Sequence, residues 1–333
     1  MGDVRDRALR VSVVVATHNG TRFLESQLRS ILRQQRPIDE VVLSDDASTD
    51  GTIELARATI ESYRDPTHQL DLVVLTNPIA LGVTRNFERG MRAATGDLIA
   101  LSDQDDIWRP DRVERAVQVF RERPDVLLVA SDAELIGADD APLGRRLLET
   151  LGVDERTLAR LGADSAAREL LRRNLVTGAT MVVRRQLVER ATPFPVSWVH
   201  DEWLAIVAAA SGRMVVLPDA LIGYRQHDAN QIGVSRASLR DRMSRLRTPR
   251  TPRNARLLAR AGALAARAPE IASGDEAFIA AAIDKLGHEQ VRSTLPAPRL
   301  RRVLPVLREQ RTGRYSAYGN GPQDVLRDLV QPR

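Results

Sequence analysis

Three carboxylates, those of Asp103, Asp105 and Asp106, follow directly after the apolar run 98–101. Carboxylates at the end of a buried strand are costly to desolvate unless a cation meets them. Asp103 and Asp105 are two residues apart, so an extended backbone points both to one side, where they can bind a divalent cation such as Mn²⁺ or Mg²⁺. Because α/β sheets bind ligands at the C-terminal ends of their strands, the segment predicts a site in which a cation bridges the phosphates of a nucleotide. The alternative is an Asp-rich loop that only caps the helix expected from residue 110.

Three further polar loops each follow an apolar run that we expect to form a strand. Thr17 and Asn19 come after the first run and can hydrogen-bond a base or a ribose. The second loop, residues 44–52, is rich in aspartate, and a carboxylate there can accept the N3–H of a uracil or thymine ring. Arg85 follows the third run and can pair with a diphosphate in the bidentate manner of a guanidinium, with a solvated surface arginine as the alternative. Four polar loops at one edge of a sheet favour a nucleotide-diphosphate site.

Other nucleotide and cation motifs are excluded. Residues 46–57 begin like a calcium-binding loop, but the position that requires glutamate is Arg57. A P-loop needs lysine after glycine, and the one lysine of the chain, Lys285, is followed by leucine. The turn at 17–20 lacks the G-x-G-x-x-G fingerprint of dinucleotide-binding folds. Asp50 is expected to cap the N-terminus of the next helix instead of contacting a ligand.

The elements that must position these loops alternate between strands and helices. Short apolar runs rich in β-branched residues predict strands buried on both faces, and segments with helical patterns separate them. This alternation predicts an α/β fold with a mostly parallel sheet flanked by helices. The expected strands are 11–16, 41–44, 72–75, 98–101 and 126–130, and the expected helices are 21–35, 51–62, 84–94 and 110–122.

The pattern loosens after residue 131. A polar turn at 137–140 leads into helical stretches. Beyond residue 235 the chain is rich in arginine and interrupted by proline, which predicts a helical appendage with a frayed end. Between these regions we expect strands at 177–183, 214–217 and 221–225 and a helix at 198–211.

The composition is that of a soluble globular protein, with 43% hydrophobic and 28% charged residues among 333. The chain has no cysteine, which excludes disulfides, thiolate catalysis and zinc–thiolate sites. Its longest apolar run, 204–210, is too short to span a bilayer, and we expect no secretory signal at the N-terminus. Residues 236–333 contain 20 basic and 9 acidic side chains, whereas residues 1–235 contain 29 basic and 35 acidic ones.

Three motifs in order carry a resemblance to a known family. They are the strand and turn at 11–20, the aspartate-rich run at 45–52 and the acidic segment at 103–106. Over residues 10–235 the chain resembles a family 2 glycosyltransferase of the GT-A fold, and residues 102–108 resemble the rhamnosyltransferase-like branch. The resemblance implies that Thr17, Asn19 and Asp46 hold the nucleotide base, and that Asp103 and Asp105 bind the ribose and a divalent metal on the diphosphate.

A second acidic motif, in the helix expected at 198–211, supplies the general base that the resemblance implies. An inverting transfer needs one carboxylate to take the proton from the acceptor hydroxyl as it attacks the anomeric carbon. We favour Asp201 over Glu202 for this role, and the alternative is that both only complement the helix dipole. Trp203 and Gly178 are expected on the acceptor side, where a glycine lets the acceptor approach the backbone. His227 is expected at the metal or the diphosphate, with a solvated loop histidine as the alternative.

The start of the basic appendage, residues 236–260, contains nine arginines and a single acid, Asp241. It predicts a segment attracted to anionic lipid, which would bring the protein to a membrane-bound acceptor. A solvated helical surface packed on the main domain is the alternative. The segment has no aromatic side chain for stacking on bases and the chain shows no DNA-binding motif, so we expect no nucleic-acid partner.

These features together predict an inverting, metal-dependent glycosyltransferase in the cytoplasm, with a possible peripheral place on the inner face of the membrane. The resemblance implies dTDP-L-rhamnose as the donor and a cell-surface polysaccharide or lipid-linked glycan as the acceptor. The alternatives are a UDP-hexose transferase on the same fold and a non-catalytic protein that binds nucleotide sugar or glycan. The expected domain covers 1–235, with a nucleotide-sugar half at 10–130 and an acceptor half at 131–235, and the extension covers 236–333.

Overall fold

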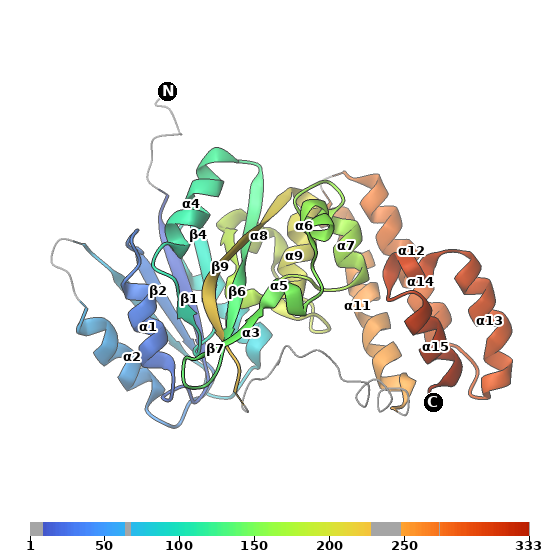
Figure 1. Ribbon diagram of the computed structural model, residues 1–333, viewed down its shortest axis with the longest axis horizontal. Helices are drawn as coiled ribbons and strands as arrows, with labels where there is room; N and C mark the ends of the chain where they lie inside the picture. Colours follow the sequence, from blue (N-terminus) through green and yellow to red (C-terminus); the bar gives the residue numbers. More distant parts are fainter. Residues whose placement is uncertain (1–8, 64–67, 228–247, 273, 333) are drawn as a thin grey trace.

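A computed structural model of the chain describes residues 9–63, 68–227, 248–272 and 274–332. Nine strands form one sheet in the order β3-β2-β1-β4-β8-β6-β9-β5, and β7 pairs with β6 (Figure 1). The strands are β1 (Val11–Thr17), β2 (Glu40–Asp45), β3 (Asp71–Thr76), β4 (Leu98–Ser102), β5 (Ile107–Trp108), β6 (Val126–Ile136), β7 (Pro142–Arg146), β8 (Val182–Arg184) and β9 (Arg213–Arg225).

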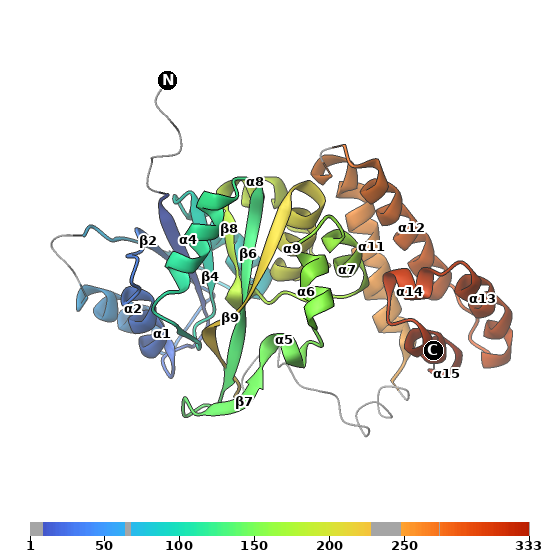
Figure 2. The same cartoon turned by 45° about the horizontal axis from the view of Figure 1, so that its top comes forward.

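Helices lie on both sides of the sheet and continue beyond it as a C-terminal helical extension (Figures 1 and 2). Those in the sheet domain are α1 (Leu24–Leu32), α2 (Thr52–Glu61), α3 (Val83–Ala93), α4 (Arg112–Glu122), α5 (Leu147–Thr150), α6 (Glu155–Leu161), α7 (Ala166–Arg172), α8 (Arg185–Ala191) and α9 (His200–Ser211), with a short 3-10 turn, η1 (Gly178–Thr180). Those in the extension are α11 (Arg250–Ile271), α12 (Glu276–Ser293), α13 (Arg299–Arg311), α14 (Arg314–Tyr318) and α15 (Pro322–Val330).

Alternate side chains of the first strands enter two separate hydrophobic cores, as the period of two along a strand requires. Val13 of β1 and Val41 of β2 belong to the core that α1, α2 and α4 close. Their neighbours Val14 and Val42 belong to the core on the other face, which α3, α8 and α9 close. The predicted α/β sheet with helices on both faces is therefore confirmed.

Pairing changes character along the sheet. β3, β2, β1 and β4 are parallel, β8 runs antiparallel between β4 and β6, and β9 is again parallel to β6. The directions of β1, β2, β4, β6 and β9 therefore agree, and their C-terminal ends meet at one edge. The loops that the sequence singles out all leave the sheet at this edge.

Several expectations about the second half of the chain are wrong in detail. The expected strand at 177–183 is a 3-10 turn followed by the short β8. The two strands expected at 214–217 and 221–225 are one strand, β9, whose register slips around Pro218 because proline cannot donate to the ladder. β6 continues across the division expected at residue 130, and no pattern in the sequence predicted β5, β7 or α8.

The C-terminal helical extension is ordered by its own packing and by the sheet domain. Leu264, Ala268 and Ile271 of α11 lie in the same hydrophobic core as α9. The final helix, α15, buries Asp328, which lies 2.7 Å from Arg292 and accepts a 2.9 Å hydrogen bond from the Tyr315 hydroxyl. The expected frayed end is therefore wrong, because charges that look solvated in the sequence are paired in the interior. Within the described ranges, no helix has both the length and the apolar character to cross a membrane.

Candidate functional site

The loops after β1 and β2 form one hydrogen-bonded unit. The Thr17 hydroxyl is buried and donates to Asp45 Oδ2 at 2.7 Å, and Asp45 also accepts from the backbone and the hydroxyl of Ser48. Asn19, in the left-handed region at φ 49°, accepts from Thr49 N through its side chain and donates its backbone N–H to Ser48 Oγ. Thr17 therefore acts inside the protein by positioning Asp45, while Asn19 is exposed at the edge. Their contact with a nucleotide base stays a prediction.

Asp46 fixes the third loop against the second. Its carboxylate accepts hydrogen bonds from Leu81 N at 2.7 Å, Gly82 N at 2.8 Å and Asn77 Nδ2 at 2.8 Å. Asp46 is 6% exposed, so most of its accepting capacity is used within the protein. Arg85, one turn into the following helix, is 40% exposed and lies 2.5 Å from Glu88. It sits at the site edge in an ion pair with Glu88, and its role toward a diphosphate stays a prediction.

Asp50 is not the N-cap residue of α2. Gly51 occupies that position with φ 84°, a left-handed conformation that favours glycine. The Asp50 carboxylate still accepts from Thr52 N at 3.2 Å and also from the hydroxyl of Thr21 at 2.9 Å. Asp50 therefore joins the first loop to the start of α2.

Gln104, which no sequence pattern singles out, joins the acidic loop to the loop after β1. Its Oε1 accepts from His18 N at 2.8 Å, and its Nε2 donates to the carbonyl of the same residue at 3.2 Å. A Cβ at Gly20 would lie 2.5 Å from Gln104 Oε1, so a larger residue there would displace the Gln104 side chain from its bonds to His18. His18 in turn contacts the carbonyl of Asp46 through Nδ1 at 2.6 Å. Together with the hydrogen bonds of Asp46 to the third loop, these contacts join all four predicted loops.

The acidic loop carries more negative charge than its surroundings neutralise. Burial, with the nearby charges of Asp105 and Asp201, raises the pKa of Asp103 to about 7. Burial and the other two carboxylates also raise the pKa of Asp106 well above its ordinary value. Arg112 neutralises part of this negative charge. Its guanidinium is buried and lies 3.7 Å from the centre of the Trp108 ring, and burial lowers its pKa to about 9. Carboxylates with raised proton affinity at a strand edge are suited to a cation.

Arg225 and His227, at the end of β9, meet the acidic loop from the other side. Arg225 is 1% exposed, donates through Nε to the carbonyl of Asp105 at 2.6 Å and through its backbone N–H to Asp106 Oδ1 at 3.0 Å. His227 Nε2 lies 2.8 Å from Asp105 Oδ2, and its ring packs 4.9 Å from that of Phe23. The structure thus brings His227 to the predicted metal ligand Asp105, from a position more than a hundred residues away in the chain.

The predicted ligand set of Asp103, Asp105 and His227 fits a divalent cation in its chemistry. Carboxylate oxygens and an imidazole nitrogen are ligands of Mn²⁺, and carboxylates are the usual ligands of Mg²⁺. Asp105 and His227 are in contact, and the charge of Asp105 contributes to the raised pKa of Asp103. No three acidic or histidine side chains in the described part of the chain are already gathered as a finished metal centre. The metal therefore stays a proposal.

Asp201 lies at the N-terminus of α9 and points to the same region. Its Oδ2 accepts from Gly178 N at 3.3 Å, and burial raises its pKa, against the lowering effects of His200 and Arg260. A Cβ at Gly178 would lie 2.6 Å from His200 Nε2 and 3.4 Å from Asp201 Cβ. Gly178 therefore allows η1 to pass over the start of α9. Its predicted contact with an acceptor stays a prediction, and the structure adds a positioning role.

His200, which the sequence reasoning missed, is fully enclosed behind Asp201. Its ring stacks on Phe87 with 4.2 Å between ring centres, and burial lowers its pKa, so it is neutral at pH 7. Neither ring nitrogen has a hydrogen-bond partner among the described residues. The ring of His200 thus packs between Phe87 and Gly178.

Glu202, the other candidate base, has a different environment from Asp201. Its carboxylate forms an ion pair with Arg260 of α11, and the two side chains are 20% and 21% exposed. The Arg260 guanidinium also lies 4.3 Å from the centre of the Trp198 ring, whose Nε1 donates to the Arg260 carbonyl at 3.0 Å. Because Glu202 is held by a guanidinium, the geometry favours Asp201 as the base.

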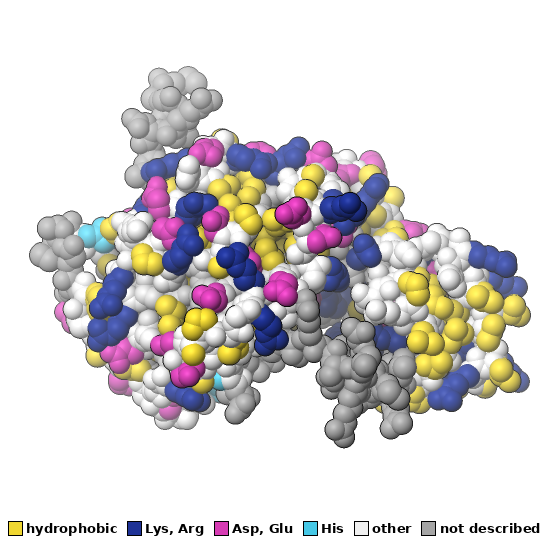
Figure 3. Space-filling view, viewed as in Figure 1, with side chains coloured by type: hydrophobic (Ala, Val, Ile, Leu, Met, Phe, Trp, Pro, Cys, Tyr) yellow, Lys and Arg dark blue, Asp and Glu magenta, His cyan; other side chains and the backbone are white. Residues whose placement is uncertain are grey.

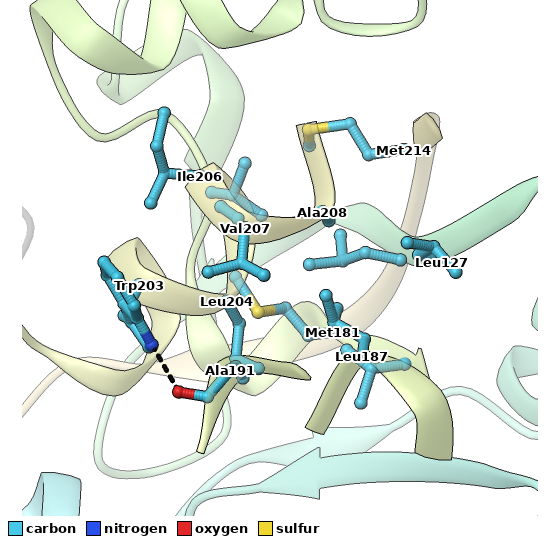
Figure 4. Close-up of a cluster of buried hydrophobic side chains, with 14 of the residues drawn as sticks. Leu127, Met181, Leu187, Ala191, Trp203, Leu204, Ile206, Val207, Ala208 and Met214 are labelled. Atoms are coloured by element: carbon cyan, nitrogen blue, oxygen red, sulfur yellow. Dashed lines mark hydrogen bonds between the residues drawn. The ribbon is translucent and has the colours of Figure 1, made fainter. Parts of the chain in front are cut away.

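The expectation that Trp203 faces an acceptor is wrong. Trp203 is fully buried, and its indole N–H donates to the carbonyl of Ala191 at 2.8 Å (Figure 4). The rest of α9 is also apolar and enclosed, with Leu204, Ile206 and Val207 at zero exposure. A helix that is apolar on all sides is a core helix, so its tryptophan packs inside the protein.

The described part of the basic segment 236–260 does not present its arginines to a membrane. Arg250 is 2% exposed and donates to the carbonyls of Arg292 and Pro296. Arg253 lies 3.0 Å from Asp328, and Arg260 pairs with Glu202. Three of the four arginines between 248 and 260 thus hold the extension together, which contradicts the lipid role for this part. Residues 236–247 lie outside the described residues.

Comparisons with known proteins agree with the motifs and the fold. The sequence model of "Glycosyl transferase family 2" matches residues 12–190. An uncharacterized glycosyltransferase of Nostoc sp. is 28% identical over 228 residues, which cover 67% of this chain and 66% of that protein. The dTDP-rhamnosyl transferase RfbG of Shigella flexneri is 35% identical over 106 residues, covering 31% of this chain and 35% of RfbG. The matched stretches thus span less than two thirds of these relatives.

Solved structures share the fold at low sequence identity. S. aureus TarS in complex with UDP has a TM-score of 0.57 and 15% identity, with 97% of this chain and 90% of TarS residues 1–349 covered. The mannosyltransferase PcManGT of Pyrobaculum calidifontis, in complex with GDP-Man and Mn²⁺, has a TM-score of 0.52 and 20% identity, with 98% and 87% covered. The chain therefore has the fold of these enzymes, the GT-A fold that the motifs predicted.

Proposed function

This chain belongs to glycosyltransferase family 2, and we propose that it transfers a sugar from a nucleoside-diphosphate donor to an acceptor hydroxyl with inversion at the anomeric carbon. The observation that carries the proposal is the meeting of Asp103, Asp105 and Asp201 at one sheet edge, where the charges of Asp105 and Asp201 both act on Asp103. A nucleotide diphosphate with its cation supplies the positive charge and the ligand oxygens that such an edge lacks. The loops that follow β1, β2 and β3 provide hydrogen-bonding groups beside this edge.

The chemistry needs one carboxylate base and a neutralised leaving group. Asp201 takes the proton of the acceptor hydroxyl while that oxygen forms a bond to the anomeric carbon. The bond from the anomeric carbon to the β-phosphate oxygen breaks on the opposite face, and the nucleoside diphosphate leaves with the electron pair. Asp103, Asp105 and His227 would hold a divalent cation, which neutralises charge on the leaving diphosphate when bound. Arg85 would add a guanidinium to the diphosphate after its side chain rotates away from Glu88.

The donor that we propose is dTDP-L-rhamnose. Support comes from the segment 102–108, which is similar to the rhamnosyltransferase-like branch, and from the partial match to RfbG. A UDP-linked hexose is the second candidate, favoured by the shared fold with TarS, which was solved with UDP-GlcNAc and with UDP. A non-catalytic protein that binds nucleotide sugar is disfavoured because Asp103, Asp105 and Asp201 are all present.

The acceptor that we propose is a growing surface polysaccharide or a lipid-linked glycan, handled on the cytoplasmic face of the membrane. A relative of similar type is the putative teichuronic acid biosynthesis glycosyltransferase TuaG of Bacillus subtilis, 31% identical over 113 residues that cover 34% of this chain and 42% of TuaG. The helix–turn region of Gly178 and the start of α9 border Asp201, and the acceptor would enter there.

Calorimetric titration with dTDP, UDP and GDP, with and without Mn²⁺, tests the nucleotide part of the proposal. We expect one nucleotide to bind in the presence of the metal, and Asp105→Ala to weaken binding at least about tenfold through loss of a charged ligand. The matched control is Asp164→Ala, because the Asp164 side chain is 86% exposed and its ion-pair partner is Arg213, away from the acidic loop. Absence of binding by all three nucleotides with metal present would overturn the proposal.

A further inference from the structure

Helix α13 of the C-terminal helical extension turns its apolar side to solvent. Leu300, Val303, Leu304 and Leu307 follow the spacing i, i+3, i+4 and i+7, which places them on one face of the helix. Their exposed fractions are 88%, 39%, 66% and 42%. In an ordinary surface helix this stripe would face the core. We call it the α13 apolar stripe.

The opposite face of α13 shows why the helix is held this way round. Val306 is fully buried in the small core with Tyr315 and Leu295. Arg302 is 1% exposed and donates to the carbonyl of Pro296 at 2.7 Å and of Gln331 at 2.6 Å. Glu309 lies 2.7 Å from His288 Nδ1. Arg302 and Glu309 on the buried face thus have defined partners, so rotation of α13 to bury the apolar stripe would break these bonds.

Positive charge surrounds the α13 apolar stripe. At about 100° per residue, Arg301 and Arg308 lie along one side of the stripe, Arg299 along the other and Arg311 at its end. All four are exposed, and the one acid of the helix, Glu309, is buried. Figure 3 shows apolar side chains gathered on the C-terminal helices with Lys and Arg side chains next to them. Figures 1 and 2 place α13 at the end of the molecule away from β3.

We propose that the α13 apolar stripe, with Arg299, Arg301, Arg308 and Arg311, docks this chain on the surface of an anionic lipid bilayer. An apolar stripe flanked by arginines is the chemistry of a helix that lies in the membrane interface, where leucines enter the acyl region and cations meet the headgroups. A second copy of the chain fits less well, because a symmetric contact through this stripe brings like charges together. The proposal moves the membrane contact from 236–260 to α13.

This inference deepens the proposed function. It rests on that function in one respect: a lipid-linked acceptor would give the chain a reason to bind the membrane. Its test measures binding to lipid and uses no donor or acceptor. A failure here would therefore leave the transfer proposal intact, and a failure of nucleotide binding would leave this inference intact.

Flotation of the full chain with vesicles tests the inference. One set of vesicles is phosphatidylcholine and the other contains equal parts of phosphatidylcholine and phosphatidylglycerol. We expect binding to the anionic set that weakens as salt is added, because the arginines contribute by charge. Leu300→Glu and Leu304→Glu should each weaken binding by about tenfold or more, since each removes a leucine from the acyl region. Both sites are exposed, so circular dichroism and the unfolding temperature should stay at wild-type values.

The matched control is Val196→Glu, an apolar side chain that is 87% exposed but isolated on the sheet domain. It should bind anionic vesicles like the wild type. Equal loss in Val196→Glu and Leu304→Glu would overturn the assignment to α13, as would binding that neither leucine variant alters. Lack of vesicle binding together with a concentration-dependent dimer that Leu304→Glu dissolves, measured by analytical ultracentrifugation, would overturn the lipid proposal in favour of self-association.

Discussion

At the scale of single residues, the site depends on how closely Gly178, His200 and Asp201 approach one another. Asp201 is enclosed enough for burial to raise its pKa, yet it keeps a backbone donor, Gly178 N, at 3.3 Å. Burial outweighs the effects of His200, the Gly178 N–H and Arg260, which each lower that pKa. A carboxylate in such a setting has a higher proton affinity than one in water, which is the property that a general base needs.

Gly178→Ala tests this packing. A Cβ at 2.6 Å from His200 Nε2 forces the ring or η1 to move, because His200 is stacked on Phe87 behind it. We expect a cost of about 1–3 kcal/mol in the free energy of unfolding and a fall in the rate of transfer larger than the change in nucleotide affinity. Chemical denaturation and donor turnover measure the two effects. Gly262→Ala on α11, where the nearest atom would be 4.0 Å away, is the matched control: it should leave turnover unchanged and raise the free energy of unfolding by up to about 1 kcal/mol, because alanine favours the helix interior. An unchanged rate in Gly178→Ala would contradict the positioning role.

At the scale of elements, the C-terminal helical extension completes the site from outside the sheet domain. α11 brings Arg260 to Glu202, one residue after the proposed base, and clamps the start of α9 through Trp198. This contact could not be predicted from the sequence, because arginine is the common basic residue throughout the chain and Arg260 has no distinguishing neighbour. The same reason hid Arg112 and Arg225, which carry the buried positive charge under the acidic loop.

Arg260→Gln should therefore lower transfer without changing nucleotide affinity. The change leaves the partly buried Glu202 without its ion-pair partner, at a cost of about 1–3 kcal/mol in the free energy of unfolding, and loosens α9 at Asp201. Arg256→Gln, one turn earlier on α11 and exposed, is the matched control. Arg260→Lys should restore part of the rate, since it keeps the charge but loses the planar fork. Equal nucleotide affinity and equal turnover in wild type and Arg260→Gln would contradict the role.

The elements also show what sequence patterns can decide. The strands that precede the four polar loops were predictable, because a β-branched run ending in Asp103 or Thr17 has one plausible setting in an α/β fold. The burial of Trp203 could not be predicted, because the sequence pattern of a tryptophan beside two acids is the same whether the tryptophan lines a cleft or fills a core. The exposed face of α13 could not be predicted either, since the spacing of its apolar residues indicates a buried stripe. What turns it outward is the set of long-range partners of Arg302 and Glu309.

At the scale of the whole molecule, the sheet domain and the extension are one packed body with two working surfaces. The sheet edge with Asp103, Asp105 and Asp201 is acidic and suited to a cation and a nucleotide diphosphate. The α13 apolar stripe is flanked by arginines and suited to an anionic bilayer. Leu264 and Ile271 of α11 share a core with α9, so the extension links the two surfaces rigidly. An enzyme built this way would hold its acceptor region at a fixed distance from the membrane.

The pH dependence of donor turnover, measured for the intact chain and for Asp201→Asn, tests whether Asp201 is the catalytic base. A base works only when deprotonated, so turnover should be highest on the alkaline side of the Asp201 pKa, which burial raises above its ordinary value. It should then fall as pH drops through a value above that of an ordinary aspartate. Asp201→Asn should bind the nucleotide like the wild type, lack this acidic limb and turn over about 10²–10⁴-fold more slowly. Wild-type turnover and pH profile in Asp201→Asn would contradict the central claim.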